Sequence, residues 1–578
     1  MAIFKGELAI VLAGEAGQGI QTIETLLTGL LKSGGYHVFA TKEYMSRVRG
    51  GLNSTTIRIA SRRVAAFREK IDFLIPLHKD AITHLKDRIT EDTVVIGEKE
   101  IIAYNPMIDV PFTKMAAEMG NAVYANILAV GFIAGLFKID KEQCLRFIAG
   151  HFVKKDEEIR EKNITAAKKG FEIGEGLSGE TTIIIEKNAA VAGEIMLTGA
   201  EAVALGALAG GCNYLCAYPM SPSTAVLTQM AAYSKQTDII VEQVEDETGV
   251  VNMAIGAWYA GARAMVTTSG GGFALMTEGI SLAGMIESPL VVHLAQRPGP
   301  ATGLPTRTEQ GDLNLALYAG HGAFPRIILA PKSIEDAFFL SQKAFNLADK
   351  YQVPVFILTD QYLMDTYYNM PLWDMDRLKA ERYFIETKED YRRFQFTETG
   401  VSPRGIPGLG KGIVCVDSDE HDEGGYITED SDTRIKMVEK RLSKFDAMKK
   451  DIMPPAFTGA EDYETLIVGW GSTFHAISEA LEKMGRNDTA HLHFSWLYPF
   501  SEKTAAYLEK ATKIIVVEGN ATGQFGQLLK LEAGYRADSL LKYNGLPFSV
   551  EELAEKISAL CKSRKSHKSH KSMNSSLE

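Results

Sequence analysis

The sequence predicts an α/β protein made of three doubly wound parallel-sheet domains. Short apolar runs bounded by turn residues, such as 264–268 and 290–294, are typical of strands buried on both faces. These runs alternate with stretches of helical character, and strand–helix alternation favours parallel sheets. With 578 residues the chain is too long for a single core, so several domains are expected.

The first predicted domain covers residues 1–180. It opens with a strand at 7–13, a glycine loop and a helix at 22–33. Residues 156–190 are charged and then glycine-rich, which indicates a linker. The second predicted domain follows at residues 191–370.

The second half of the chain is less regular at first. Residues 371–460 are rich in charge, proline and glycine, and we interpret them as a surface connection with a helix only around 433–450. Residues 461–560 predict a third domain that contains parallel strands. Residues 561–578 repeat Ser-His-Lys and predict a disordered tail.

The composition is that of a soluble globular protein, with 46% hydrophobic and 23% charged residues. The net charge of −11 argues against a nucleic-acid-binding surface. No run of 18 apolar residues predicts a membrane span, and the apolar start leads directly into a glycine loop instead of a signal-peptide cleavage site. The five cysteines are scattered, so we expect no iron–sulfur cluster or other metal on this chain and a cytoplasmic location.

A carboxyl group at the start of an apolar helix is the strongest catalytic candidate. Glu247 follows a predicted strand at 238–242 and begins a predicted helix. Burial raises the pKa of a carboxyl group, so this side chain could hold a proton at neutral pH. Glu245 and Asp246 are alternatives, and acidic residues at a helix start also serve as ordinary caps.

A loop and an arginine are candidates for binding an anion. The segment Tyr218-Pro219-Met-Ser221-Pro-Ser223 offers two hydroxyl groups on a loop stiffened by proline, although a plain turn is the alternative. Arg297 follows a buried strand, where open α/β sheets place their ligands, and it could pair with a carboxylate or with a structural partner. A glycine-dense turn, Ser269-Gly-Gly271-Gly-Phe273, lies between them in the sequence.

The N-terminal glycine loop, Gly14-Glu-Ala-Gly17-Gln-Gly19-Ile20, separates a strand from a helix, so its amides could face an anion. It has isoleucine where a phosphate-binding loop needs lysine, and only two glycines fit a dinucleotide fingerprint. A tight turn and a site for a phosphorylated group, with charge from Arg47 and Arg49, both stay open. A nucleotide-binding dehydrogenase and a non-catalytic scaffold are the competing functions.

In this order, these segments resemble the alpha subunit of the 2-oxoacid:ferredoxin oxidoreductases, most closely the 2-oxoglutarate type with a fused N-terminal gamma domain. The resemblance spans residues 1–560, with Met220 where the family more usually has isoleucine. Further matching segments are Gly303-Leu-Pro-Thr306, Gln310-Gly-Asp-Leu313, Glu518-Gly-Asn520-Ala-Thr-Gly523-Gln524 and Arg49-Gly-Gly51.

The resemblance implies a gamma-like domain, a thiamine pyrimidine-binding domain and a transketolase C-terminal-like domain. It implies that Glu247 activates thiamine diphosphate by sharing a proton with the aminopyrimidine ring. The implied substrate-binding residues are Ser221, Ser223 and Arg297, and the implied cofactor-binding residues are Tyr218, Pro219 and Gly271 besides Glu247. Candidates for binding CoA or a phosphate are Gly17, Gly19, Arg47, Arg49 and Asn520.

The resemblance also implies partners. This chain lacks the Gly-Asp-Gly…Asn signature that holds a magnesium diphosphate, so a beta subunit is expected to bring the diphosphate site, Mg²⁺ and a [4Fe-4S] cluster. The implied assembly is an (αβ)₂ heterotetramer that passes electrons to ferredoxin. The implied reaction is the CoA-dependent, reversible oxidative decarboxylation of a 2-oxoacid, which fixes CO₂ when reversed. 2-Oxoglutarate is the expected substrate, and pyruvate and branched-chain 2-oxoacids are alternatives.

Overall fold

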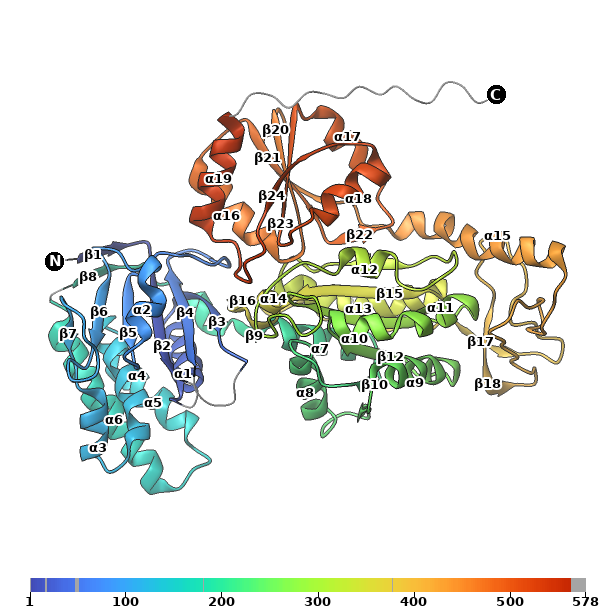
Figure 1. Cartoon of the computed structure of the whole chain (residues 1–578). Coiled ribbons are helices and arrows are strands. Elements are labelled where there is room, and N and C mark those ends of the chain that lie inside the picture. Colours follow the sequence, from blue (N-terminus) through green and yellow to red (C-terminus); the bar gives the residue numbers. More distant parts are fainter. Residues whose placement is uncertain (1, 16–17, 47–50, 180, 377, 563–578) are drawn as a thin grey trace. The chain divides into compact units, whose positions relative to one another are not determined.

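A computed structural model describes residues 2–15, 18–46, 51–179, 181–376 and 378–562. The chain divides into two compact units (Figure 1). Unit 1 comprises residues 1–198 with 365–374, and unit 2 comprises residues 199–364 with 375–578. Both are layered α/β structures, so the predicted fold class is confirmed.

The sheet of unit 1 is mixed, which differs from the parallel sheet that we predicted. In spatial order its strands are β7 (Ile108–Asp109), β6 (Val94–Gly97), β5 (Phe73–Pro76), β2 (Glu7–Glu15), β4 (Leu52–Ala60), β3 (His37–Glu43), β16 (Tyr367–Met370) and β9 (Ile195–Thr198). The parallel half contains β2, β5, β6 and β7, and the antiparallel half contains β4, β3, β16 and β9. The reason is that β4 returns antiparallel between β2 and β3. A separate parallel pair joins β1 (Ala2–Lys5) to β8 (Thr181–Ile184).

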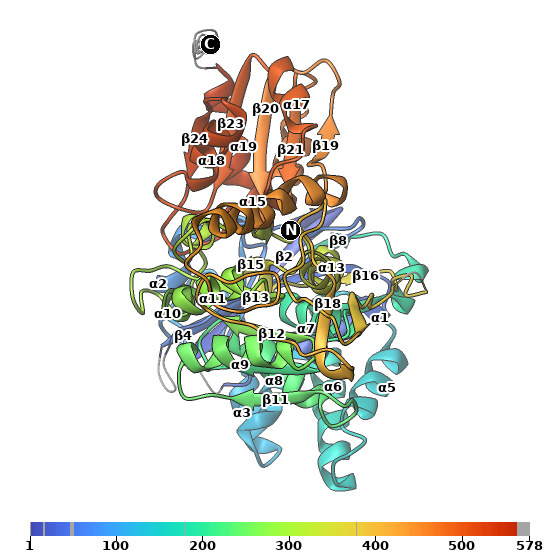
Figure 2. The same cartoon turned by 90° about the vertical axis from the view of Figure 1, so that its right-hand side faces the viewer.

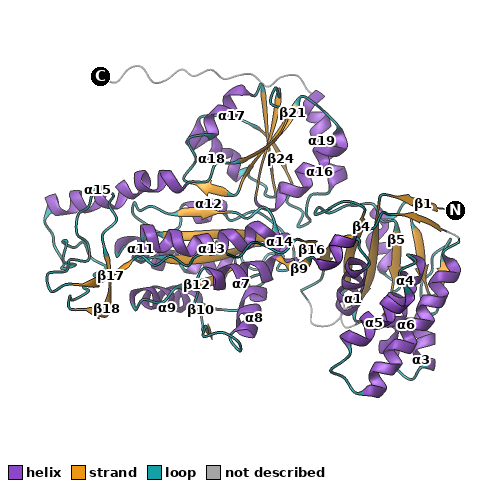
Figure 3. Cartoon of the chain, turned by 180° about the vertical axis from the view of Figure 1, so that it is seen from behind, coloured by secondary structure: helices purple, strands orange, loops and turns teal. Residues whose placement is uncertain are grey.

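Helices lie on both faces of this sheet (Figure 1 and Figure 3), and its central strand is therefore buried on both sides. Along β2, Leu8, Ile10 and Leu12 join the larger core, and Val11 and Ala13 join the smaller core on the other face. The helices are α1 (Ile20–Ser33), α2 (Ala81–Leu85), α3 (Phe112–Glu118), α4 (Ala125–Leu136), α5 (Lys141–His151) and α6 (Glu157–Leu177).

Helix α6 occupies most of the segment that we predicted to be a linker, and its glycines explain the error. Gly170 and Gly174 lie where α6 crosses α4, and Gly131 and Gly135 lie on the facing side of α4. A methyl group added at Gly174 would come within 1.9 Å of the Phe132 carbonyl oxygen. These glycines therefore allow two helix backbones to touch, and they do not mark a flexible connection.

The central sheet of unit 2 is parallel except at one edge. Its order is β11 (Ile240–Gln243), β10 (Tyr214–Ala217), β12 (Ala264–Thr268), β13 (Leu290–Gln296), β15 (Pro354–Asp360), β14 (Ile327–Leu329) and antiparallel β22 (Trp496–Tyr498). Figure 2 shows α9 (Glu247–Tyr259), α10 (Gly270–Leu275) and α11 (Thr277–Met285) on one side of this sheet, with α7 (Gly199–Ala209) and α13 (Ile334–Tyr351) on the other. The remaining helices are α8 (Thr224–Tyr233), α12 (Leu313–Leu317) and α14 (Gln361–Asp365).

A second sheet belongs to the same unit, and we call residues 456–562 the C-terminal subdomain. Its order is β19 (Ala456–Gly459), β21 (Thr489–Phe494), β20 (Thr465–Trp470), β23 (Lys513–Glu518) and β24 (Asp538–Leu541), and only β19 is antiparallel. In Figure 1, α16 (Phe474–Met484) and α19 (Val550–Lys562) lie on one side of it, with α17 (Thr504–Lys510) and α18 (Gln524–Ala533) on the other. Strand β22 extends from this subdomain into the central sheet and joins the two into one unit.

The segment between the central sheet and the C-terminal subdomain is held in place by buried ion pairs. It contains β17 (Phe384–Thr387), β18 (Arg404–Gly410) and the predicted helix, α15 (Ser431–Met448). Lys440 and Lys444 of α15 each approach the buried carboxylate of Glu287 to 2.6 Å. These charges hold the pKa of Glu287 well below its usual range despite its burial. Among the described residues, no helix is both long and apolar enough to cross a bilayer.

Replacing Gly174 by alanine should destabilise unit 1 by about 1–3 kcal/mol, because the methyl group would meet backbone that cannot move aside. Gly176 lies two positions further along α6, and a methyl group there would meet nothing within 4 Å. Gly176→Ala should therefore leave stability unchanged or raise it by about 0.5–1 kcal/mol. Urea unfolding of the full chain, followed by circular dichroism, measures both changes. Equal effects of the two variants would refute the close helix contact.

Candidate active site at the carboxyl edge of the central sheet

The sequence-predicted residues of unit 2, apart from Asn520, gather along one edge of the central sheet. Because β10 to β13 run parallel, their carboxyl ends lie together. The segments that follow these strands carry Tyr218 after β10, Glu247 after β11, Gly271 after β12 and Arg297 after β13. Open α/β sheets bind ligands in this place.

The sequence offered three neighbouring acids as candidates for the catalytic carboxyl group, and these acids differ in their surroundings. Glu245 and Asp246 are exposed, and the Asp246 side chain caps α9 by accepting a hydrogen bond from the Gly249 N–H at 2.8 Å. Glu247 is the first residue of the helix and is only 3% exposed. Capping is thus done by Asp246, which leaves the Glu247 carboxyl group available for another role.

The Glu247 carboxyl group is buried without a full set of partners. Its Oε1 atom forms no hydrogen bond with any described residue. Burial raises the pKa of Glu247 above its ordinary value, and the nearby charge of Asp246 raises it further. A buried oxygen that lacks a partner is costly in a folded chain, so this atom marks a place where a ligand can supply one.

The glycine turn packs directly against this carboxyl group, and the residue in contact is Gly272. A methyl group there would lie 2.3 Å from both Glu247 Oε1 and Thr268 Oγ1. Gly271, which we had singled out from the sequence, is exposed, and a methyl group there would meet nothing nearer than 3.9 Å. Sequence reasoning identified the turn and missed Gly272, because three adjacent glycines do not reveal which one faces a neighbour.

The loop after β10 is held by Arg297. Its Nη1 atom donates a hydrogen bond to the carbonyl oxygen of Ser221 at 2.7 Å. Tyr218 is 40% exposed, and Pro219 and Ser221 are partly exposed. These side chains thus remain accessible at the edge of the sheet.

Ser223 is buried in this loop, and its role in substrate binding stays a prediction. The side chain is 1% exposed, and its hydroxyl donates a hydrogen bond to the Met220 carbonyl oxygen at 2.6 Å. The hydroxyl is therefore used to shape the loop. This hydrogen bond follows from the fold of the loop, which the order of residues alone does not reveal.

A further carboxyl group, Asp312, lies at the same edge and was missed as a site residue. Its two carboxylate oxygens are each 2.6 Å from where a methyl group on Gly270 would lie, so the carboxyl group abuts the glycine turn. Burial raises the pKa of Asp312 to about 7, the charge of Glu309 raises it, and Arg297 opposes both effects. The Oδ2 atom forms no hydrogen bond with any described residue.

The loop that carries Asp312 is fastened to the C-terminal subdomain by Gln310, which is 2% exposed. Its N–H donates to the Gly519 carbonyl at 2.6 Å, and its Oε1 accepts from the Gly519 N–H at 2.8 Å. Its Nε2 donates to the Trp470 carbonyl at 3.0 Å. Gln524 adds two bonds, accepting from the Asn314 N–H and donating to the Gly311 carbonyl. We call these contacts the Gln310 clamp.

Asn520 belongs to this clamp, and its contact with CoA or a phosphate stays a prediction. It is 1% exposed. Its Nδ2 donates to Glu518 Oε2 at 2.6 Å and to the Gln310 carbonyl at 3.2 Å, and its Oδ1 accepts from the Gly523 N–H at 2.7 Å. The amide is thus used within the protein. The segment that contains it therefore joins the C-terminal subdomain to the loop that follows the central sheet.

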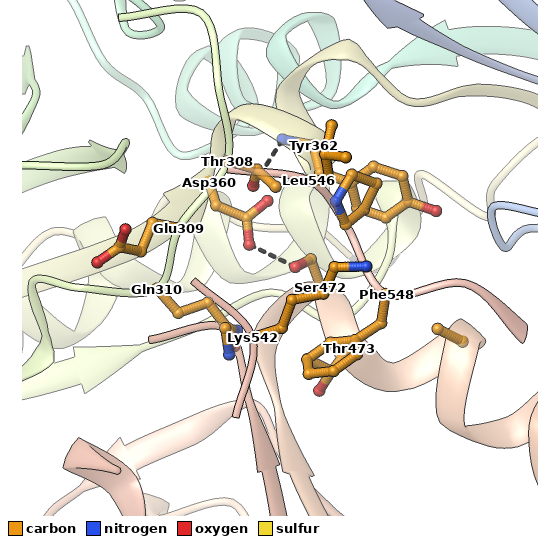
Figure 4. A pocket seen from close by; sticks show the side chains of 13 residues that line it. Thr308, Glu309, Gln310, Asp360, Tyr362, Ser472, Thr473, Lys542, Leu546 and Phe548 are labelled. Carbon is orange, nitrogen blue, oxygen red and sulfur yellow. Dashed lines mark hydrogen bonds between the residues drawn. The ribbon is translucent and has the colours of Figure 1, made fainter. Parts of the chain in front are cut away.

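A small cavity lies beside the clamp and is not a ligand site of useful size. Its volume is about 30 Å³, which is enough for one or two water molecules. Figure 4 shows the Ser472 hydroxyl donating a hydrogen bond to Asp360 Oδ2 there, and the Tyr362 N–H donates to Thr308 Oγ1 at 3.2 Å. The cavity therefore lies where the central sheet meets the C-terminal subdomain.

The N-terminal glycine loop lines a larger cavity within unit 1. Gly19 caps α1 with a φ of 77°, and a methyl group there would lie 2.0 Å from Asn126 Nδ2. Gly19, Thr22, Asn126 and Lys155 are among the residues around a cavity of about 820 Å³. The other predicted residues of this loop site, Gly17, Arg47 and Arg49, lie outside the described residues.

No group of three or more potential metal ligands is gathered in the part of the chain that the structure describes.

Comparisons with known proteins match both units. A family model described as "Pyruvate flavodoxin/ferredoxin oxidoreductase, thiamine diP-bdg" matches residues 205–440, and one described as "Pyruvate ferredoxin/flavodoxin oxidoreductase" matches residues 9–173. The 2-oxoacid:ferredoxin oxidoreductase subunit alpha of Sulfolobus sp is 32% identical, over 96% of this chain and 97% of the relative. The 2-oxoglutarate oxidoreductase subunit KorA of Mycobacterium tuberculosis is 28% identical, over 96% of this chain and 92% of the relative.

A solved structure is similar over nearly the whole chain. It is the 2-oxoglutarate:ferredoxin oxidoreductase of Magnetococcus marinus, with 2-oxoglutarate, coenzyme A and succinyl-CoA bound. The TM-score is 0.91 with 28% sequence identity, and the match covers 96% of this chain and 99% of that chain.

Gln310→Ala should destabilise unit 2 by about 2–4 kcal/mol, because it leaves the Gly519 N–H and the Trp470 carbonyl buried without partners. Gln527 is an exposed glutamine whose Nε2 donates to the Thr522 carbonyl in the same subdomain. Gln527→Ala should change stability by less than about 0.5 kcal/mol. The free energy of unfolding in urea measures both. A small effect of Gln310→Ala would mean that the clamp does not hold the loop.

Proposed function

Because this chain belongs to the 2-oxoacid:ferredoxin oxidoreductases, as an alpha subunit, we propose that its substrate is 2-oxoglutarate. The proposed reaction is the reversible, CoA-dependent oxidative decarboxylation of 2-oxoglutarate to succinyl-CoA and CO₂, with electrons passed to ferredoxin. The proposed partner is a beta subunit that brings the diphosphate site, Mg²⁺ and a [4Fe-4S] cluster, in a cytoplasmic (αβ)₂ heterotetramer.

The observation that carries the thiamine-dependent chemistry of this proposal is the unpartnered Oε1 atom of buried Glu247. An aminopyrimidine ring has a ring nitrogen that can accept a proton from, or share one with, a neutral carboxyl group. The raised pKa of Glu247 and the close glycine turn fit such a ring. Thiamine diphosphate, when bound, supplies a carbon nucleophile for attack on the 2-oxo group.

The residues of this chain have separate proposed tasks around that chemistry. Glu247 holds a proton at its carboxyl group, in a buried place from which water is largely excluded. Tyr218, Pro219 and exposed Gly271 offer the surface that faces the cofactor. Arg297 binds the substrate carboxylate by charge-assisted hydrogen bonds, and Ser221 lies beside it.

The preference for 2-oxoglutarate is supported by relatives and not by a second cation. The M. tuberculosis relative is named for 2-oxoglutarate, and the M. marinus structure holds that compound. One arginine accounts for one carboxylate, and among the residues that the structure describes we identify no partner for the second. Pyruvate and branched-chain 2-oxoacids are therefore the substrates against which the proposal is tested.

We propose that CoA binds to unit 1. The cavity of about 820 Å³ lies in the size range of small-molecule sites. Gly19 and Thr22 bring the first turn of α1 to it, where backbone N–H groups favour a phosphate, and Lys155 adds positive charge. The M. marinus relative was solved with CoA bound.

The complex of this chain with a cluster-bearing beta subunit should reduce a viologen dye when given 2-oxoglutarate and CoA, and the isolated chain should not. Catalytic efficiency, kcat/KM, should be highest for 2-oxoglutarate among several 2-oxoacids. Steady-state assays of the co-purified complex measure this. A higher efficiency with pyruvate would reject the proposed substrate and leave the family assignment intact.

Glu247→Gln in the same complex should lower kcat by roughly 10²–10⁴, the scale of lost general acid–base assistance. The substitution keeps the shape of the side chain but removes the shared proton. Glu245→Gln is the matched control, because Glu245 precedes the same helix and is exposed, and it should retain nearly full turnover. If the Glu247 variant turned over like the wild type, its assigned role would be wrong.

A further inference from the structure

Asp312 combines a fixed backbone with a buried carboxylate oxygen that lacks a hydrogen-bond partner among the described residues. Its N–H donates to Gln296 Oε1 at 3.0 Å, and Gln296 Nε2 in turn donates to the Thr359 carbonyl at 3.1 Å. On either side, Gly311 and Asn314 are held by Gln524. Yet Asp312 Oδ2 is buried and forms no hydrogen bond with any described residue. Native proteins rarely leave such an atom unpaired without a reason.

The carboxyl group faces the same edge of the sheet as Arg297. It abuts Gly270 at the start of the glycine turn, on the loop that the Gln310 clamp holds over the ends of the strands. The charged groups that act on it are Arg297, which follows β13, and Glu309 on its own loop. The glycine turn contributes no charge. Asp312 is thus an acid that interacts electrostatically with the arginine that we assign to the substrate carboxylate.

We propose that Asp312 is a substrate-binding residue, which in its neutral form donates a hydrogen bond to the carboxylate that Arg297 holds. The proposal rests on the proposed function of the site. When ionised, the same side chain would repel that carboxylate and compete for the guanidinium group. Asp312 would then make substrate affinity depend on pH.

The direction of that dependence follows from the surroundings of Asp312. Burial raises its pKa to about 7, Glu309 acts in the same sense, and Arg297 acts in the opposite sense. The carboxyl group is therefore mostly neutral below about pH 7 and mostly charged above it. Substrate should bind more tightly to the neutral form, so KM for the 2-oxoacid should rise as pH increases through this range.

The test measures KM and kcat of the assembled complex for 2-oxoglutarate at several pH values, in wild type and in Asp312→Asn. Wild-type KM should rise about tenfold between about pH 6 and about pH 8.5, the size of one lost hydrogen bond to a charged group. Asp312→Asn keeps a donor that does not titrate, so the difference in KM between the two pH values should shrink to less than about twofold.

Two further variants complete the test. Glu309→Gln keeps Asp312 but removes a neighbouring negative charge, so the rise in KM should begin at lower pH. This variant also serves if Asp312→Asn fails to fold. Asp462→Asn makes the same charge change at a fully exposed position in the C-terminal subdomain, and its profile should match the wild type.

The outcomes separate this proposal from the proposed function. A KM profile of Asp312→Asn parallel to that of an active wild-type complex would overturn the role of Asp312 and leave the function standing. An unchanged profile in Glu309→Gln would overturn it as well. A wild-type complex that turns over no 2-oxoacid would instead overturn the proposed function, and the role of Asp312 with it. A flattened profile in Asp312→Asn and an earlier rise in Glu309→Gln would support the proposal.

Discussion

The Gln310 clamp is the interaction on which the candidate site depends. One buried glutamine bonds to two segments of the C-terminal subdomain, and Gln524 returns two bonds to the same loop. Each bond contributes little net free energy, but each broken one would leave a buried polar group unpaired. The C-terminal subdomain therefore influences the site through the loop that it holds. It fixes the loop of Asp312 over strands that belong to the other sheet.

The edge of the sheet that carries the candidate site contains two carboxyl groups whose situation is opposite to that of Glu287 in the same unit. Glu287 is buried between Lys440 and Lys444, which keep it charged. Glu247 and Asp312 lack such partners, and burial raises the pKa of each. Paired acids hold the fold together, whereas unpaired acids are costly to it. That contrast distinguishes the residues that a ligand needs from those that the chain needs for its own stability.

Close backbone contact through glycine occurs in both units. In unit 1, facing glycines let α4 and α6 touch, and in unit 2, Gly272 lets the turn after β12 meet Glu247. Neither contact tolerates a side chain, because the neighbouring atom is backbone in the first case and a confined carboxyl group in the second. Glycine in this chain therefore indicates tight packing at some positions and loops at others.

The sequence by itself determined the α/β class, the strands that precede Glu247 and Arg297, and the start of α9, because periodicity and turn residues are local properties. Only the tertiary structure decided which acid is buried, that Ser223 and Asn520 are used internally, and that Gly272 and Asp312 lie at the site. It also decided that the first sheet is mixed. These features depend on contacts between segments far apart in the chain, and no local pattern of residues specifies them.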